Sequence, residues 1–95
     1  MTGASNLYLR LTGQTMAPLR IYSRPGCHLC ELLLEDLLPL VRGRLEIEVV
    51  NIDDDAELGR EYGTRIPVLE FAGQFVCQYT LDHSAIREIL DRLPK

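Results

Sequence analysis

The sequence predicts an α/β domain with a four-stranded mixed sheet flanked by helices, in the order β-α-β-α-β-β-α. Three observations lead to this fold class. Short apolar segments alternate with longer ones whose leucines and isoleucines recur at helical spacing. Gly and Pro residues punctuate the boundaries between the segments. A two-residue Ala-Gly link joins the last two strand segments, and so short a link requires an antiparallel hairpin.

Length and composition restrict the classes of partner. The 95 residues suffice for one domain with a single core. With 14 carboxylates against 10 Lys and Arg, the chain is acidic, which argues against nucleic acid because phosphate binding needs a basic face. No apolar run of about 18 residues occurs, so no membrane span is expected. The absence of a secretory signal predicts a cytoplasmic location.

The chain is expected to divide into an N-terminal tail, residues 1–16, and a folded domain, residues 17–95. The tail is rich in small and polar residues, which favours flexibility. Three leucines alternate with other residues within positions 7–12, so an extra edge strand is the alternative. A translation start at Met16 is a further hypothesis, which the intact mass of natively expressed protein would test.

The first half of the domain begins with a strand predicted at residues 19–23, which ends at the turn-forming pair Pro25-Gly26. A helix follows, and the residues expected on its apolar side are Leu33, Leu37, Leu38 and Val41. Pro39 is expected to kink this helix or end it early, because proline lacks a backbone donor and clashes with the preceding turn. Gly43 closes the segment.

The middle of the domain is predicted to contain a strand at residues 45–52 and a short helix at 56–62. The three aspartates at 53–55 offer N-caps for that helix, and their negative charge suits the positive end of its dipole. Gly63 is expected to end the helix as a left-handed C-cap.

Two strands, residues 68–71 and 74–78, are predicted around the Ala-Gly link. The final helix carries apolar residues at 86, 89, 90 and 93, and it has Asp82 or Ser84 near its start. The first two strands are joined through a helix, so they should be parallel with a right-handed crossover, and helices should cover both faces of the sheet.

Cys27 and Cys30 form a Cys-x-x-Cys pair at the start of the first helix. Cys27 falls at the N-cap or first turn, where unpaired N–H groups and the helix dipole favour the nucleophilic thiolate. Cys30 lies one turn further on the same side, where it is more buried, so the two resemble an attacking and a resolving thiol. His28, if protonated, would further favour the thiolate; the alternative is a solvated histidine at a helix start.

Two other interpretations of the pair stay open. A structural zinc site would need four ligands, and only Cys77 and His83 remain as further candidates, with Cys77 poorly placed inside a strand. The pair could instead be two inert buried cysteines. In the cytoplasm a close pair is catalytic or metal-binding more often than a structural disulfide. The order of strand, Pro-Gly turn, Cys-x-x-Cys and helix favours redox chemistry, so no metal site is predicted. Cys77 is expected to be a small apolar core residue, with a second redox role as the alternative.

Residues 22–30, Tyr-Ser-Arg-Pro-Gly-Cys-His-Leu-Cys, resemble the active-site segment of glutaredoxins. Residues 64–68, Thr-Arg-Ile-Pro-Val, resemble the Thr-Val-Pro motif of the same family. In element order the match covers residues 19–93, and the histidine after the first cysteine makes the chain most similar to a bacterial glutaredoxin-like family. The resemblance implies a thioredoxin-like fold of the glutaredoxin type, with Cys27 as the nucleophile and Cys30 as the resolving thiol.

The resemblance also implies roles for residues around the pair. Pro67 matches the family's cis-proline, whose peptide would turn the backbone of Arg65 and Ile66 toward an extended substrate. The alternative is a trans proline that opens a strand. Arg24 takes the position of the active-site lysine, where it would attract a glutathione carboxylate or be a solvated surface charge.

One departure from the family concerns glutathione. Glutaredoxins that bind it usually carry a Gly-Gly pair after the last strand, followed by Asp, whereas residues 78–83 here read Gln-Tyr-Thr-Leu-Asp-His. Asp82 would hold the glutathione amino group or cap the helix, and Tyr79 would fill part of the groove. Glutathione is therefore a candidate co-substrate only, and no tightly bound cofactor is expected.

The leading hypothesis is a monomeric thiol–disulfide oxidoreductase. Cys27 attacks a protein or small-molecule disulfide, and Cys30 resolves the mixed disulfide. The reductant is expected to be glutathione or a flavoprotein reductase. Two alternatives stay open: a module that binds an iron–sulfur cluster through Cys27 and glutathione across a dimer, and a non-catalytic interaction domain on the same scaffold.

Overall fold

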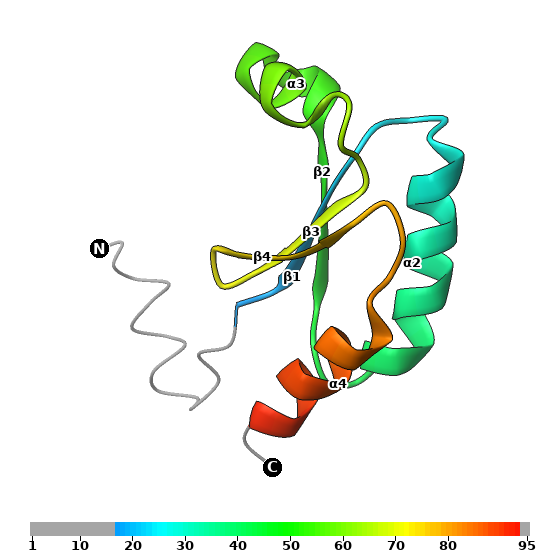
Figure 1. Ribbon diagram of the computed structural model, residues 1–95, viewed down its shortest axis with the longest axis vertical. Helices are drawn as coiled ribbons and strands as arrows, with labels where there is room; N and C mark the ends of the chain where they lie inside the picture. The colour runs from blue at the N-terminus through cyan, green and yellow to red at the C-terminus, as the bar shows by residue number, and fades with distance from the viewer. Residues whose placement is uncertain (1–16, 94–95) are drawn as a thin grey trace.

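The computed structural model describes residues 17–93 and confirms the predicted element order (Figure 1). The elements are β1 (Leu19–Ser23), α2 (His28–Val41), β2 (Ile47–Asn51), the 3₁₀ turn η1 (Ile52–Asp54), α3 (Ala56–Tyr62), β3 (Val68–Phe71), β4 (Gln74–Gln78) and α4 (His83–Arg92). The predicted tail, residues 1–16, lies outside the described residues, and so does the alternative of an extra strand there. Among residues 17–93, no helix has the length and apolar character needed to cross a membrane.

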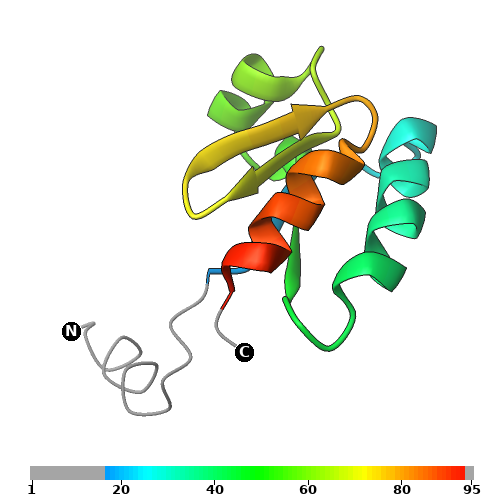
Figure 2. The ribbon, with the colours of Figure 1, turned by 60° about the horizontal axis from the view of Figure 1, so that its bottom comes forward.

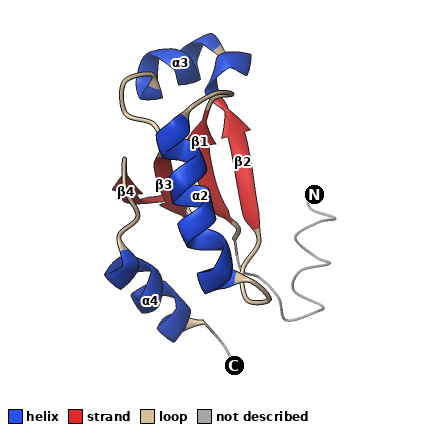
Figure 3. Cartoon of the chain, turned by 90° about the vertical axis from the view of Figure 1, so that its right-hand side faces the viewer, coloured by secondary structure: helices blue, strands red, loops and turns tan. Residues whose placement is uncertain are grey.

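The four strands form one mixed sheet in the order β2-β1-β3-β4. β1 runs parallel to β2, and β3 is antiparallel to both β1 and β4, which confirms the predicted strand directions. The β3–β4 hairpin turns at Ala72 and Gly73, whose φ angles of 52° and 78° are typical of a type I′ turn. β2 and β4 are the two edge strands of this sheet (Figure 3).

Helices cover both faces of the sheet, as predicted, with α2 and α4 on one face and α3 on the other (Figure 2). The larger core lies under α2 and α4, and its buried residues are Leu19, Ile21, Leu33, Leu37, Val41, Leu69, Cys77, Ile86, Leu90 and Leu93. A smaller cluster on the α3 side consists of Tyr22, Ile52 and Val68. Strand β1 contributes to both clusters because successive side chains of a strand point to opposite faces.

Two stacked tyrosines tie α3 to the sheet. The rings of Tyr22 and Tyr62 have centroids 4.1 Å apart and an interplanar angle of 12°. Both hydroxyls donate to the Glu70 carboxylate, each at 3.2 Å. Burial, followed by the hydrogen bond with Tyr22, raises the pKa of Tyr62 well above its usual range. This cluster fixes the end of α3 and thereby the start of the loop that leads to β3.

Helix α2 differs from the sequence prediction in its second half. It continues through Pro39 to Val41 instead of ending early. Only the last turn follows the proline, and the Arg42 N–H still donates to the Leu38 carbonyl at 3.0 Å, so the turn closes without the missing donor. Leu38 was expected in the core, but it is 40% exposed. It lies on the solvent-facing side of the helix, whereas the neighbouring Leu37 faces the core.

Two other boundaries also differ from the prediction. β2 spans Ile47–Asn51 and not residues 45–52, because its pairing with β1 begins at Ile47 and the Asn51 side chain already caps η1. Gly63 does not adopt the left-handed conformation, since its φ is −54°. Close approach explains this glycine instead: a Cβ there would lie 2.5 Å from the Gly59 carbonyl oxygen, to which the Gly63 N–H donates at 2.9 Å.

Candidate functional site

A tight turn delivers Cys27 to the start of α2. The Cys27 N–H donates to the Arg24 carbonyl at 3.2 Å, and Gly26 has a φ of 80°. Proline followed by a glycine of positive φ is the signature of a type II turn. A Cβ on Gly26 would meet nothing within 4 Å, so the backbone conformation, and not lack of space, requires glycine there.

Cys27 is the N-cap of α2, which confirms the predicted position. Its sulfur accepts the Cys30 N–H at 3.2 Å, and its backbone is extended, with φ −81° and ψ 107°. Its carbonyl accepts the Glu31 N–H at 3.1 Å and so begins the helix. A sulfur in the place normally taken by a Ser or Asp oxygen faces the positive end of the helix dipole, where a thiolate is stabilised.

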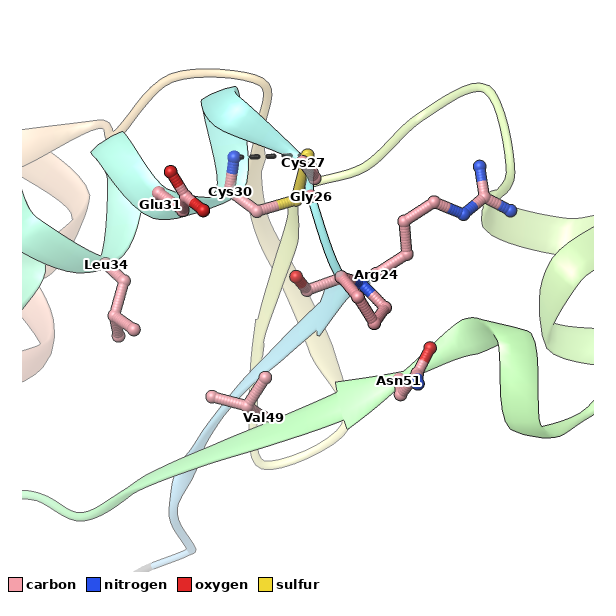
Figure 4. A pocket seen from close by; sticks show the side chains of 10 residues that line it. Arg24, Gly26, Cys27, Cys30, Glu31, Leu34, Val49 and Asn51 are labelled. Carbon is pink, nitrogen blue, oxygen red and sulfur yellow. Dashed lines mark hydrogen bonds between the residues drawn. A yellow bond between two sulfur atoms is a disulfide. The ribbon is translucent and has the colours of Figure 1, made fainter.

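Cys27 and Cys30 are joined by a disulfide, with their Cα atoms 5.2 Å apart (Figure 4). Cys30 is only 5% exposed and belongs to the buried residues of the domain, whereas Cys27 at the turn is half-buried. A solvent-borne disulfide can therefore reach Cys27 but not Cys30. This difference in access is the one expected between an attacking and a resolving thiol.

His28 stands in solvent at the first residue of α2. Its side chain is 79% exposed, and its Nδ1 lies 3.9 Å from an oxygen of Glu31, one turn further along the helix. The pairing of an exposed histidine with an exposed carboxylate in this first turn corresponds to the solvated alternative stated for His28. A positive charge on His28 would therefore interact with the Glu31 carboxylate as well as with a Cys27 thiolate.

Arg24 is held by Asp53 at the start of η1. Its Nε and one terminal nitrogen lie 3.1 and 2.9 Å from the same Asp53 oxygen. The Arg24 side chain extends away from the disulfide in Figure 4, and its charge is partly neutralised by this ion pair. A carboxylate of a bound ligand would have to share or displace Asp53.

The peptide between Ile66 and Pro67 is cis, as the resemblance implied. Pro67 is buried, and Ile66 packs against the smaller core cluster. The N–H groups of Arg65 and Ile66 both donate to the Tyr62 carbonyl, at 2.8 and 3.1 Å. Pairing of this backbone with an extended substrate stays a prediction. The Arg65 guanidinium lies over the Tyr62 ring at 5.3 Å, and its Nε donates to the Gln78 side chain at 3.2 Å.

Tyr79 connects the end of β4 to this loop. Its hydroxyl donates to the Thr64 carbonyl at 2.9 Å, and its N–H donates to the Pro67 carbonyl at 2.9 Å. Its φ is 71°, and the Thr80 N–H donates to the Gln78 carbonyl at 2.8 Å across it, which makes Tyr79 the centre of a γ-turn of the rare positive-φ type. The sequence suggested that Tyr79 fills part of the groove, but it did not indicate this γ-turn or the hydrogen bond from the Tyr79 hydroxyl to Thr64.

Asp82 caps α4, with its Oδ1 accepting the Ala85 N–H at 3.1 Å, which is one of the two roles considered for it. Nearby Cys77 is a free, buried thiol in β4, as expected for a small core residue. Burial raises the pKa of the Cys77 thiol, and this keeps it protonated and unreactive.

A cavity of about 290 Å³ lies beside the disulfide, and sequence reasoning did not find it. It is bounded by Leu34 of α2, by Val49 and Asn51 of β2, and by both cysteines (Figure 4). The alternation of β2 gives no sign of it, because the cavity depends on how far α2 extends over the edge strand. Across residues 17–93, no group of three His, Cys, Asp or Glu residues is placed to hold a metal ion.

Comparison with known proteins shows the family. The profile of the Glutaredoxin-like domain (DUF836) matches residues 18–91. The solution structure of protein Ne2328 from Nitrosomonas europaea is similar at 39% identity, with 76% of this chain and 88% of that chain covered and a TM-score of 0.67. The crystal structure of protein XcR50 from X. campestris is similar at 36% identity, with 80% and 99% covered and a TM-score of 0.62.

A more distant similarity supports the fold alone. Thioredoxin from Fasciola hepatica matches at 21% identity, with 94% of this chain and 92% of that chain covered and a TM-score of 0.50. The thioredoxin-like fold predicted from the sequence is thereby confirmed. No significant match is found among curated protein sequences.

Proposed function

This chain belongs to the glutaredoxin-like domain family, and we propose that it is a thiol–disulfide oxidoreductase that works through Cys27 and Cys30. The observation that carries the proposal is the placement of the two sulfurs. One caps a helix N-terminus within reach of solvent, and the other lies buried at bonding distance from it. Two cysteines that served only as core residues would both be buried, and neither would need a helix N-terminus.

The first step is attack by the Cys27 thiolate on one sulfur of a protein or small-molecule disulfide. A mixed disulfide forms, the substrate's own S–S bond breaks, and the departing sulfur takes up a proton. The Cys30 N–H, which donates to the Cys27 sulfur at 3.2 Å, stabilises the thiolate before the attack. The exposed turn at Pro25 and Gly26 leaves room for the substrate in front of this sulfur.

In the second step Cys30 loses its proton and attacks the Cys27 sulfur. The mixed disulfide breaks, the second substrate thiol leaves, and the Cys27–Cys30 disulfide of the structure results. Two electrons have passed from the protein to the substrate. A reductant must then reopen the bridge, and glutathione and a flavoprotein reductase are the two candidates.

Three contacts make glutathione the weaker candidate. The Arg24 charge is engaged by Asp53, and the Ile66 N–H is engaged by the Tyr62 carbonyl. The Tyr79 hydroxyl donates to the carbonyl of Thr64, in the loop that precedes the cis-proline. Glutathione would therefore meet Cys27 through its sulfur with few other preformed contacts. We propose a dithiol reductant, such as the redox site of a flavoprotein reductase, as the physiological electron donor.

The test is equilibration of the purified protein in glutathione redox buffers, followed by alkylation and mass measurement. The expected result is a reversible two-proton loss assigned by peptide mapping to Cys27 and Cys30. Cys77 serves as the internal control, since it should stay reduced throughout. If both thiols stay unmodified at every ratio of oxidised to reduced glutathione, the redox function is wrong. A persistent glutathione adduct on Cys27 would instead restore glutathione as the reductant.

A further inference from the structure

The cavity beside the disulfide is a consequence of an incompletely covered sheet edge. Val49 of β2 pairs in register with Ile21 of β1, on the face that α2 covers. Ile21 is 1% exposed, whereas Val49 is 55% exposed, so α2 reaches over β1 but not over the edge strand. The space left between the helix and the strand runs up to the sulfurs of Cys27 and Cys30.

The walls of the cavity are mainly apolar. Leu34 from α2 and Val49 from β2 point toward each other across the space (Figure 4). Pro25 also lines the cavity. Covering an exposed valine with an apolar group is favourable, because apolar surface is removed from water. A volume of about 290 Å³ lies at the small end of the range for ligand sites, which suits a small organic body and not a folded segment.

Arg24 at the rim of the cavity is already paired with a carboxylate. Among the described residues 17–93, Arg24 is the one basic residue that lines the cavity, and its guanidinium is engaged by Asp53 at 2.9 Å. The carboxylate of Glu31 lies 3.9 Å from His28. A ligand with carboxylates would therefore find no unengaged basic side chain among the lining residues that the structure describes. An uncharged ligand needs no basic side chain, so the engagement of Arg24 by Asp53 does not weaken its binding.

From these observations we propose that the cavity binds the hydrocarbon part of a small, uncharged aliphatic disulfide and presents one of its sulfurs to Cys27. The proposal rests on the redox function proposed above and names the substrate class of that same site. The Cys27 thiolate attacks the presented sulfur, and the substrate's S–S bond breaks. Cys30 then attacks the Cys27 sulfur and displaces the presented sulfur, so the substrate leaves in its reduced thiol form with two added protons and the protein keeps the disulfide.

The experiment is a single turnover, in which the pre-reduced protein is itself the reductant. Two disulfides are compared: lipoamide, an uncharged cyclic disulfide on an aliphatic chain, and glutathione disulfide, which carries four carboxylates. Oxidation is stopped by alkylation at short times, and the Cys27–Cys30 disulfide is measured by mass. The variants are Val49→Asn and, as a matched control, Phe75→Asn on the other edge strand, where Phe75 is 56% exposed.

Val49→Asn should slow the reaction with lipoamide by roughly four- to fifteenfold, because about half of a valine side chain is available for burial. The rate with glutathione disulfide should change by less than about twofold, and Phe75→Asn should change neither rate by more than that. The rate of Cys27 alkylation by iodoacetamide should be the same in all three proteins, which shows that the thiol itself is unaltered.

Two results would overturn the proposal. In one, Val49→Asn reacts with lipoamide as fast as the unchanged protein; in the other, it slows both disulfides equally. Failure of the underlying redox function has a different signature, since reduced protein would then form no Cys27–Cys30 disulfide with either compound. The two failures are therefore distinguishable in the same set of measurements.

Discussion

Tyr79 offers a direct test of the strain at the site, through the pair of variants Tyr79→Ala and Tyr79→Gly. Both remove the ring and its hydrogen bond to the Thr64 carbonyl, so they differ only in the Cβ at a φ of 71°. At an ordinary position glycine is the less stable of the two, by roughly 0.5–1 kcal/mol. A left-handed backbone reverses the order, because a Cβ there costs about 1–2 kcal/mol.

We therefore expect Tyr79→Gly to be more stable than Tyr79→Ala by about 0.5–1 kcal/mol, which is a difference of roughly 2–8 °C in melting temperature for a domain of this size. The assay is urea unfolding of the oxidised proteins, with free energies taken from transitions of equal slope. The matched control pair is Arg87→Ala and Arg87→Gly on the exposed side of α4, where alanine should be the more stable residue. An alanine variant at position 79 as stable as the glycine variant would refute the strained γ-turn.

Three further outcomes are expected. Cys30→Ser should accumulate the mixed disulfide between Cys27 and substrate, visible as a mass adduct, whereas Cys27→Ser should form none; equal adducts on both variants would contradict the assigned roles. Asp82→Ala should destabilise the domain by about 1 kcal/mol in urea unfolding, because the Ala85 N–H loses its cap; no loss would mean that the cap contributes nothing. Burial raises the pKa of Tyr62 in the folded protein, so the unfolded state loses this proton first and stability should fall as pH rises above 10, its usual value. The fall should be shallower in Tyr62→Phe, and identical pH profiles for the two proteins would show that Tyr62 is not responsible.

The elements whose ends are set by local chemistry were predicted to the residue. β1 ends where Pro25 and Gly26 form a type II turn, and the β3–β4 hairpin turns at Ala72 and Gly73. The position of Cys27 is also set locally: a turn followed at once by a helix predicts the N-cap or the first turn, and the structure has Cys27 at the N-cap. Each of these features depends on residues within a few positions, and such residues are visible in the sequence.

Two features that were missed depend on backbone contacts one helical turn away. Pro39 was expected to kink α2 or to end it early; α2 does not end there, because its last turn is held by a hydrogen bond that the proline does not provide. Gly63 was expected to have a positive φ, whereas its absent Cβ serves the close approach of the Gly59 carbonyl. In both cases the residue type marked the end of a helix, but the contact that decides the local backbone is made with the preceding turn of that helix.

At the site, residues close to Cys27 in the sequence set its reactivity, and residues far from it in the sequence set its selectivity. In the proposed mechanism, the nucleophilic character of Cys27 comes from the helix that it caps, and the local arrangement from Arg24 to Glu31 places it there. The surroundings of the sulfur come from elsewhere in the chain: Val49 lies on an edge strand, and Tyr79 lies at the end of β4. Substitutions at these two distant positions should therefore change which disulfide reacts while the alkylation rate of Cys27 stays constant. Substitution of Gly26, by contrast, should alter that rate for every reagent, because a residue with a Cβ disfavours the φ of 80° that delivers the sulfur to the helix.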